Sequence, residues 1–233
     1  QIHAPPELSR QEVNPTELVM AELTASGLRP RRLPLGTGVV CDIGRDDLPR
    51  IALRADMDAL PITEHTGLPF SSTVDGVCHA CGHDAHTAIL MGVATLLAGL
   101  DDLPVGVRLL FQAAEEVMPG GALDAVAAGV MNGVGRIFAL HCDPGVDVGQ
   151  VGLRLGPLTS AADRIEIRLE GTGGHTSRPH LTGDLTFALA KMTTELPAIL
   201  SRRLDPRSGV SVVWGMVQAG SAPNVIPDHG VLA

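Results

Sequence analysis

Three short apolar segments, each ending in ionisable side chains, constrain most strongly what this chain can fold into. The segments RIALRADMD (50–58), VGVRLLFQAAEE (105–116) and GRIFALHCD (135–143) have the length and composition of buried strands. Helical patterns over residues 84–100 and 121–130 separate them. This β-α-β-α-β alternation predicts an α/β domain whose mixed, largely parallel sheet has helices on both faces.

The side chains at the ends of these three segments predict a functional site. Asp56 and Asp58 end the first segment, Glu115 and Glu116 end the second, and His141 lies near the end of the third. Ligands of parallel sheets bind outside the carboxyl ends of the strands. Because burying unpaired carboxylates is costly, a chance recurrence of acids there is a poor explanation. We therefore expect these side chains to converge at one edge of the sheet.

The segment CHACGHDAHT (78–87) adds side chains that bind transition metals. Cys81 and His83 are two positions apart, so both point the same way in an extended segment. Thiolate and imidazole are good ligands for such metals. Two adjacent glutamates allow one carboxylate to bind metal while its neighbour holds a proton, and His141 supplies a further nitrogen. The pattern favours a metal centre.

Other types of cysteine site fit the sequence less well. A redox pair of Cys78 and Cys81 has the C-x-x-C spacing, but it leaves the acids and the histidine at the strand ends unexplained. A c-type haem site needs the histidine directly after the second cysteine, where Gly82 stands. A structural zinc site needs a second ligand pair, and Cys41 and Cys142 do not form one.

Composition excludes several classes of partner. The net charge is −9, with 26 acidic and 17 basic residues, and nucleic acid requires a basic face. No apolar run approaches the roughly 20 residues that span a bilayer, and no signal peptide is visible. Four cysteines are too few for a disulfide scaffold. We expect no nucleic-acid or membrane partner and a cytoplasmic location.

The pattern changes in the last third of the chain. Residues 164–171 alternate like a half-exposed strand, residues 182–200 form an amphipathic helix, and residues 208–220 have the pattern of another strand. This β-α-β unit predicts a second, α+β domain over residues 158–233, after a first domain over residues 1–157. The chain stops without a further helix, so we expect the second domain to be incomplete.

Six segments together resemble one enzyme family. They are ALRADMDALPI, CHACGHDAHT, FQAAEE, ALHCDP, GTGGHTSRPH and GSAPNVIPD. Their order and spacing are similar to those of the metal-dependent amidohydrolases, a group that contains aminoacylases, hippurate hydrolases and auxin-amino-acid-conjugate hydrolases, which are relatives of glutamate carboxypeptidase. The resemblance implies that the second domain is an inserted ferredoxin-like domain, used for homodimerisation and as a lid.

The resemblance also implies an activity and a metal site. The activity is hydrolysis of the amide bond of an N-acyl amino acid by metal-activated water, with a dipeptidase or carboxypeptidase as the alternative. Two divalent ions, Mn²⁺ or Zn²⁺ (Co²⁺ or Ni²⁺ are also compatible), would be held by Cys81, His83, Glu116 and His141. Glu115 would be the general base.

Three further residues receive expected roles. By resemblance, His175 reaches the active site of a neighbouring subunit and helps to hold the oxyanion, with a polar turn as the alternative. Asn224 matches an asparagine near the substrate, or it is a turn residue. Asp58 is expected to orient a metal ligand through a hydrogen bond, or to cap a strand end.

The sequence also sets negative expectations for the site. Asp56 is expected not to bind metal, and His86 is expected to be a buried histidine with satisfied hydrogen bonds. The family's last metal ligand is a histidine near its C-terminus, and His229 does not match it. One metal site is therefore expected to be incomplete. A catalytically inactive homologue that acts as a metal-binding or interaction protein stays a further alternative.

Overall fold

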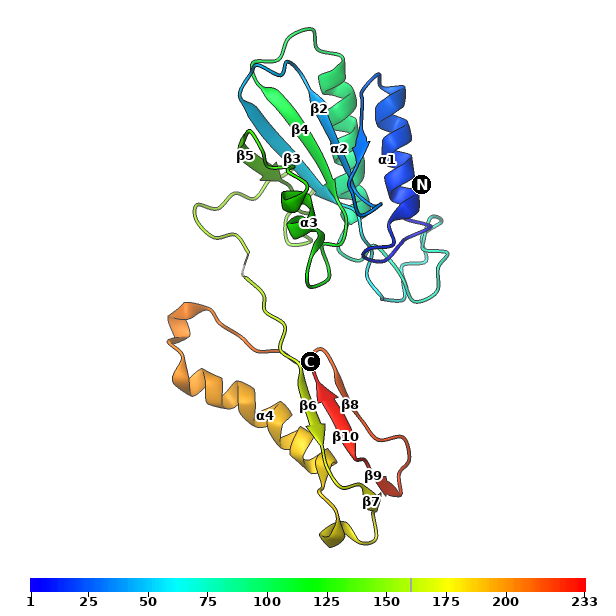
Figure 1. The fold of residues 1–233 in the computed structure, drawn as a ribbon, viewed down its shortest axis with the longest axis vertical. Helices are drawn as coiled ribbons and strands as arrows, with labels where there is room; N and C mark the ends of the chain where they lie inside the picture. Colours follow the sequence, from blue (N-terminus) through cyan, green and yellow to red (C-terminus); the bar gives the residue numbers. More distant parts are fainter. Residues whose placement is uncertain (160) are drawn as a thin grey trace. The chain divides into compact units, whose positions relative to one another are not determined.

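A computed structural model describes residues 1–159 and 161–233 and divides into two compact units (Figure 1). The first unit is Gln1–Leu153 and the second is Arg154–Ala233. Within these residues, no helix has both the length and the apolar composition that a membrane span requires.

The first unit contains a five-stranded mixed sheet with the strand order β1-β2-β4-β3-β5. The three predicted strands are confirmed as β3, β4 and β5, and β3 pairs in parallel with both of the others. The antiparallel strands β2 and β1 extend the sheet beyond β4, and β5 forms the opposite edge. The strands are β1 (Arg31–Arg32), β2 (Val39–Ile43), β3 (Arg50–Asp56), β4 (Gly106–Gln112) and β5 (Val134–Ala139).

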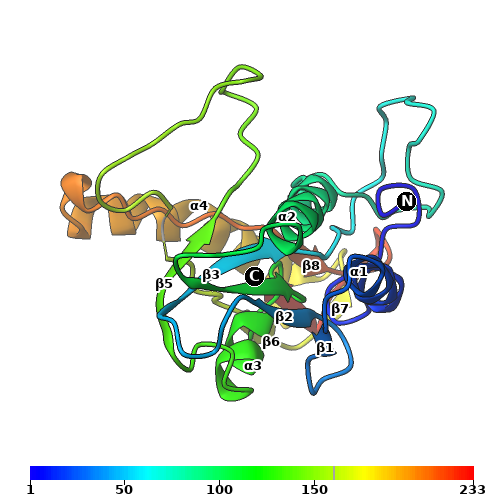
Figure 2. The ribbon, with the colours of Figure 1, turned by 90° about the horizontal axis from the view of Figure 1, so that it is seen from above.

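Helices cover both faces of this sheet, as the alternation predicts (Figure 2). On one face, α1 (Val13–Ala25) and α2 (His83–Ala98) pack against the strands, and on the other lies α3 (Gly121–Ala127). Side chains alternate along each strand, so neighbouring residues enter opposite cores. The first core includes Val19, Leu23, Leu90, Ala94, Val39, Cys41, Leu109 and Phe111, and the second includes Leu33, Val40, Leu110, Ala125 and Val130.

The central strand β4 is buried along its whole length, although it contains an arginine. Arg108 donates from Nε and Nη2 to the two carboxylate oxygens of Asp42, at 2.7 and 2.8 Å, and from Nη1 to the carbonyl of Val130 at 2.7 Å. A bidentate ion pair satisfies the charge of a buried guanidinium. The strand can therefore run through the core and present its carboxyl end to the site.

The second unit is built around one helix and a small antiparallel sheet with the order β6-β10-β8. The strands β6 and β8 flank β10 and are both antiparallel to it, so β6, α4 and β8 form a β-α-β unit split by β10. The elements are β6 (Ile167–Glu170), α4 (Leu185–Arg203), β8 (Val217–Ala219) and β10 (His229–Leu232), with the two-residue strands β7 (Gly174–His175) and β9 (Val225–Ile226) and the 3₁₀ turns η1 (Pro179–Leu181) and η2 (Pro206–Ser208).

The helix expected over residues 182–200 is confirmed as α4, three residues further along the chain at Leu185–Arg203, whereas the bounds expected for β8 are wrong. The Asp184 side chain caps α4, accepting a hydrogen bond from the backbone N–H of Phe187 at 3.0 Å. The strand expected over residues 208–220 is only three residues long, because β10, its partner, is short and pairs with three of those residues. The sequence did not predict β10 itself. At its Gly230 a Cβ would lie 2.5 Å from the Leu189 side chain, so glycine lets α4 pack closely on this strand.

Candidate metal centre

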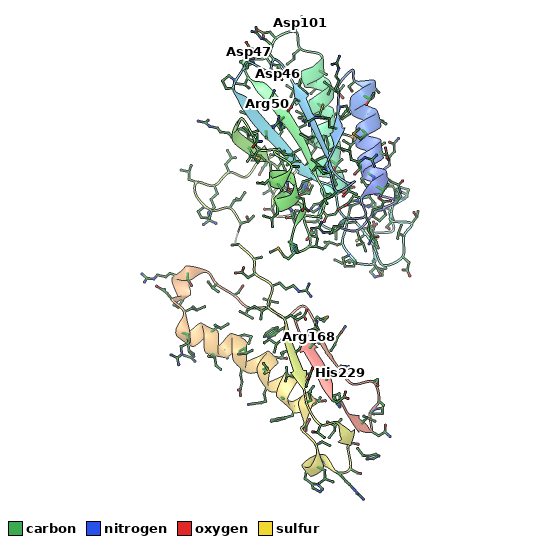
Figure 3. All side chains as sticks on the ribbon, in the orientation of Figure 1. Asp46, Asp47, Arg50, Asp101, Arg168 and His229 are labelled. Carbon is green, nitrogen blue, oxygen red and sulfur yellow. The ribbon has the colours of Figure 1, made fainter. Side chains whose placement is uncertain are left out.

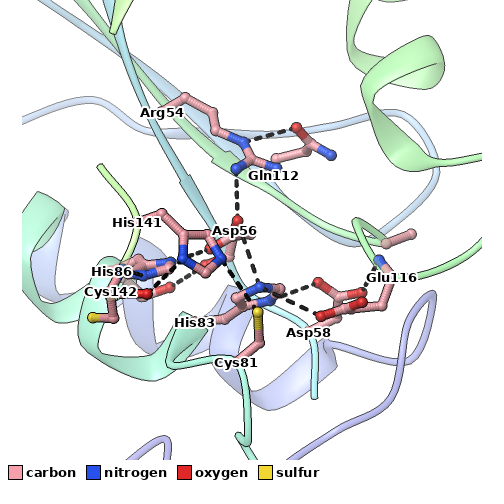
Figure 4. A network of polar contacts seen from close by, with 12 residues as sticks. Arg54, Asp56, Asp58, Cys81, His83, His86, Gln112, Glu116, His141 and Cys142 are labelled. Carbon is pink, nitrogen blue, oxygen red and sulfur yellow. Dashed lines mark hydrogen bonds and ion pairs between the residues drawn. The ribbon is translucent and has the colours of Figure 1, made fainter. Parts of the chain in front are cut away.

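Six of the predicted site residues gather at the carboxyl ends of the strands of the first unit, and all of them except Glu115 are labelled in Figure 4. Parallel strands deliver them from three places: after β3, after β4 and after β5. The loop that leads into α2 completes the site, with His83 as the first residue of that helix. The gathered residues are Asp58, Cys81, His83, Glu115, Glu116 and His141.

His83 lies at the middle of the site and has one uncommitted nitrogen. Its side chain is 1% exposed, and its Nδ1 lies 3.2 Å from an oxygen of Asp58. A carboxylate only accepts, so Nδ1 carries the proton and the lone pair of the neutral ring is on Nε2. Among the residues that the structure describes, buried Nε2 has no hydrogen-bond partner, and it faces Asp56 and Glu116, whose nearest oxygens lie 3.6 and 3.7 Å away. A buried imidazole nitrogen among anionic groups fits a metal ligand.

His141 and Cys81 lie together on one side of this nitrogen. The Sγ of Cys81 is 3.3 Å from Nε2 of His141, whose Nδ1 donates to the carbonyl of Cys142 at 2.7 Å. His141 is therefore oriented with its other nitrogen toward the thiol. Burial raises the pKa of the Cys81 thiol to about 12, with the Glu116 carboxylate adding to the shift. A bound cation would reverse this preference for the thiol, because a coordinating thiol is deprotonated.

Two sets of potential ligand atoms share His83. Cys81, His83 and His141 form one set, and His83, Glu115 and Glu116 form the other, with ligand atoms within 4.8 Å of one another in each. Nε2 of His83 has one lone pair and can bind one cation, and the other members of the two sets offer further donor atoms beside it.

In a third cluster, of Asp56, His83 and His86, the His86 ring has no uncommitted nitrogen. Nδ1 of His86 donates to Asp56 at 2.6 Å, and Nε2 accepts from the backbone N–H of Cys142 at 2.8 Å. Both ring nitrogens are thus committed, and the residue is 3% exposed. As expected, His86 is a buried histidine whose hydrogen bonds are satisfied.

Asp58 contacts both the His83 ring and the backbone of the glutamate pair, Glu115 and Glu116. One oxygen faces His83, and the other accepts from the hydroxyl of Ser9 at 2.6 Å and from the backbone N–H of Glu116 at 3.0 Å. Burial opposes ionisation, but these hydrogen bonds outweigh it and lower the pKa of Asp58 to about 2. The carboxylate therefore stays charged and holds the His83 ring in the orientation that turns Nε2 toward Asp56 and Glu116.

Asp58→Asn tests this orienting contact. The amide NH₂ must face a donor, either the His83 ring or the pair formed by Ser9 and the Glu116 backbone. We expect metal affinity to fall by roughly 10- to 100-fold, as measured by competition with a chelator. Asp101→Asn is the matched control, because Asp101 is exposed at the opposite end of the strands (Figure 3). Equal affinities of the two variants would contradict the role of Asp58.

The two adjacent glutamates differ in their surroundings. Glu116 is half-buried with its backbone held by Asp58, whereas Glu115 is exposed. Partial desolvation of its carboxyl by neighbouring groups raises the pKa of Glu115, and the charge of Glu116 raises it further. A carboxylate with a raised pKa beside a more enclosed neighbour suits proton transfer better than permanent coordination.

Sequence reasoning missed how strongly Asp56 and Ser9 are tied to the site. Asp56 accepts from Nη1 of Arg54 at 2.6 Å as well as from His86. These bonds engage both of its oxygens, and the expectation that Asp56 does not bind metal stays a prediction. Alternation along RIALRADMD could have indicated the contact with Arg54, but no local pattern points from Ser9 to a carboxylate 49 positions away.

The other two predicted residues lie in the second unit, where they are neighbours. His175 ends β7 and pairs with Val225 of β9, and the carbonyl of Asn224 accepts from the N–H of Thr176 at 3.2 Å. Nδ1 of the exposed His175 accepts from the backbone N–H of Ser177 at 3.1 Å. The roles predicted for His175 and Asn224 remain predictions.

This α/β fold gathers a thiol, two imidazoles and two carboxylates at the strand ends of its sheet. Such a set of side chains suits hydrolytic metal chemistry. The chain matches the peptidase family M20/M25/M40 over residues 52–230, and it belongs to this family. The resemblance to the amidohydrolases of this group is thereby confirmed.

Similar proteins carry different names. A Bacillus subtilis (strain 168) protein named N-acetyl-L-cysteine deacetylase is 42% identical over 233 residues, which cover 99% of this chain and 56% of that protein. A Rhodococcus jostii (strain RHA1) protein named as glutamate–cysteine ligase 2-3 is 52% identical over 231 residues. The match covers 99% of this chain and 29% of that protein, so the ligase name describes a protein most of which has no counterpart here.

A solved structure shares the fold. The YXEP protein of Bacillus subtilis, described as a dinuclear metal binding peptidase from the M20 family, has a TM-score of 0.69 and 40% identity. The match covers 99% of this chain and 59% of that one. The chain spans less than two thirds of the length of each of these proteins.

Proposed function

We propose that this chain carries the metal-binding part of a hydrolase that cleaves the amide bond of N-acyl amino acids. The observation that carries the proposal is the unpartnered Nε2 of His83 within reach of Cys81, Glu116 and His141. His86, in the same site, instead pairs both of its ring nitrogens. The relative named as a deacetylase of an N-acetyl amino acid supports the substrate class.

The residues present fit two divalent ions. Cys81, His83, Glu116 and His141 would hold them, and Asp58 would keep the His83 ring in place. A mixed set of sulfur, nitrogen and oxygen donors is compatible with Zn²⁺ and with Mn²⁺, and with Co²⁺ or Ni²⁺. The solved relative described as dinuclear supports a count of two.

The chain's own residues divide the catalytic work. Bound divalent ions would polarise the amide carbonyl and acidify water. Glu115 takes the proton from the attacking water, and the raised pKa of its carboxyl lets it hold that proton. It then gives the proton to the leaving amine, as general acid–base catalysis requires. Glu116 would instead bind the cations.

The second unit supplies the remaining proposed roles. We place His175 and Asn224 in substrate contact, His175 through a second copy of the chain in a homodimer formed by this unit. Their proximity across the β7–β9 pair supports a shared role. All four cysteines are free thiols in the structure, which supports a reducing, cytoplasmic compartment.

Metal analysis and a substrate panel on the full-length protein test the proposal. We expect two metal equivalents per chain, release of the amino acid from N-acetyl and N-benzoyl amino acids, and loss of that activity on chelation. Free dipeptides and peptides with an open C-terminus distinguish the dipeptidase and carboxypeptidase alternatives. A full-length protein that binds no divalent metal and hydrolyses none of these amides would disprove the proposal.

A further inference from the structure

Glu12 is a fully buried carboxylate on the segment that precedes α1. It is 0% exposed, and its Oε1 accepts from the backbone N–H of Ala114 at 2.7 Å and of Arg10 at 2.9 Å. Its Oε2 is buried without a hydrogen-bond partner among the described residues. Glu12 stands at the N-cap of α1, yet its side chain makes no capping bond. A buried carboxylate with one unpaired oxygen is costly, and helix capping does not explain it.

The two residues that donate to Glu12 share an unusual backbone conformation. Ala114 has φ +53° and Arg10 has φ +67°, and they are the two non-glycine residues with positive φ in the described chain. This left-handed region is uncommon for residues with a side chain and persists only where the surroundings enforce it. One carboxylate oxygen thus holds both strained positions.

Ala114, one of the two non-glycine residues with positive φ in the described chain, directly precedes the glutamate pair Glu115 and Glu116. On one side of the pair, the Ala114 N–H is held by Glu12 and its carbonyl accepts from Gly121 at 2.8 Å. On the other side, the Glu116 N–H is held by Asp58, which also accepts from Ser9. The N-terminal segment therefore reaches both ends of the turn, through Glu12 directly and through Ser9 by way of Asp58.

We propose that Glu12 is a positioning residue whose carboxylate fixes the backbone turn at Ala114, so that Glu115 and Glu116 point to their separate tasks. This inference rests on the proposed function for those tasks. The contact spans 102 positions of sequence. Through this contact the N-terminal segment helps to position the general base, Glu115.

The test compares Glu12→Met, Glu12→Gln and Glu17→Gln in the full-length protein. Methionine keeps the volume and removes both acceptors, whereas glutamine keeps one oxygen that accepts both N–H groups. Glu17 is the matched control, because it lies in α1, is exposed and pairs with Arg32. The readouts are residue-resolved amide exchange without metal, Mn²⁺ affinity, and kcat and KM for an N-acetyl amino acid.

The expected result is specific to the turn. In Glu12→Met, the amides of residues 114–116 exchange at least about tenfold faster, and Mn²⁺ affinity falls on the order of tenfold. Misplacement of the base lowers kcat by about 10- to 100-fold with KM changed much less. Glu12→Gln recovers most of the kcat, and Glu17→Gln changes none of these readouts. Adding Ala114→Gly to Glu12→Met restores part of the kcat, because glycine adopts positive φ unaided.

Two outcomes would overturn the inference. The first is a folded Glu12→Met variant with wild-type exchange at residues 114–116 and wild-type kcat. The second needs no variant: an Ala114 amide that exchanges in the wild type at the rate of an unprotected amide is not held by Glu12. A wild-type protein that hydrolyses no N-acyl amino acid would instead refute the proposed function. Amide exchange and Mn²⁺ affinity would still decide the role of Glu12.

Discussion

Replacing Glu115 with glutamine is expected to lower kcat for amide hydrolysis by roughly 10²- to 10⁴-fold, the usual contribution of a general acid–base residue. Glutamine keeps the shape of the side chain but cannot accept and return a proton. Because the metal ligands that we propose are other residues, we expect the metal content and the melting temperature to stay at wild-type values. Steady-state kinetics and metal analysis on the full-length protein measure both.

The adjacent position provides the matched control. Glu116→Gln removes a carboxylate 3.7 Å from the uncommitted nitrogen of His83, so it should lower metal affinity as well as kcat. Adding metal should then restore part of the activity of Glu116→Gln and none of that of Glu115→Gln. If both variants lost metal equally, or if Glu115→Gln kept wild-type kcat, the division of labour between the two glutamates would be wrong.

Phe111→Ala is expected to lower the free energy of unfolding of the first unit by about 3–5 kcal/mol. Phe111 is 0% exposed and lies in β4, within the core between the sheet and the helices α1 and α2. Truncation removes a large apolar side chain and leaves a cavity in tightly packed surroundings. Denaturant unfolding followed by circular dichroism measures the loss.

Leu96→Ala is the control for this substitution. Leu96 lies in α2 but is 73% exposed, so its truncation should change the free energy of unfolding by less than about 0.5 kcal/mol. The strand that carries Phe111 also leads into the glutamate pair, so the Phe111 variant should lose activity at temperatures where it begins to unfold. A loss below about 1 kcal/mol would show that the core relaxes around the missing ring.

The sequence predicts the parallel strands and the helices α2 and α3 of the first unit because short apolar runs alternate regularly with helical patterns there. It does not predict β2, whose apolar start is short and whose partner β4 lies more than 60 positions away. It also misses β10, where Gly230 and the polar His229 break the pattern of a strand. Both strands exist because of tertiary pairing, which leaves little local signal.

The sequence also predicts that the site residues lie close together, and the reason is again the parallel sheet. Carboxyl ends of parallel strands meet at one edge, so acids placed there must meet too, and His83 and His141 follow from the same geometry. Ser9 and Glu12 were not predictable. The segment that contains them has no periodicity that points to a turn more than 100 positions away, and burial of a glutamate contradicts its polarity.

The position of β5 affects how the first unit behaves in solution. The strand lies at the edge of the sheet, with β3 as its one neighbour among the described residues, and Ile137, Phe138 and Leu140 on or beside it are 46%, 52% and 60% exposed. Unpaired N–H and C=O groups beside apolar side chains are a template for pairing with another chain. We therefore expect the first unit in isolation to aggregate edge to edge through β5.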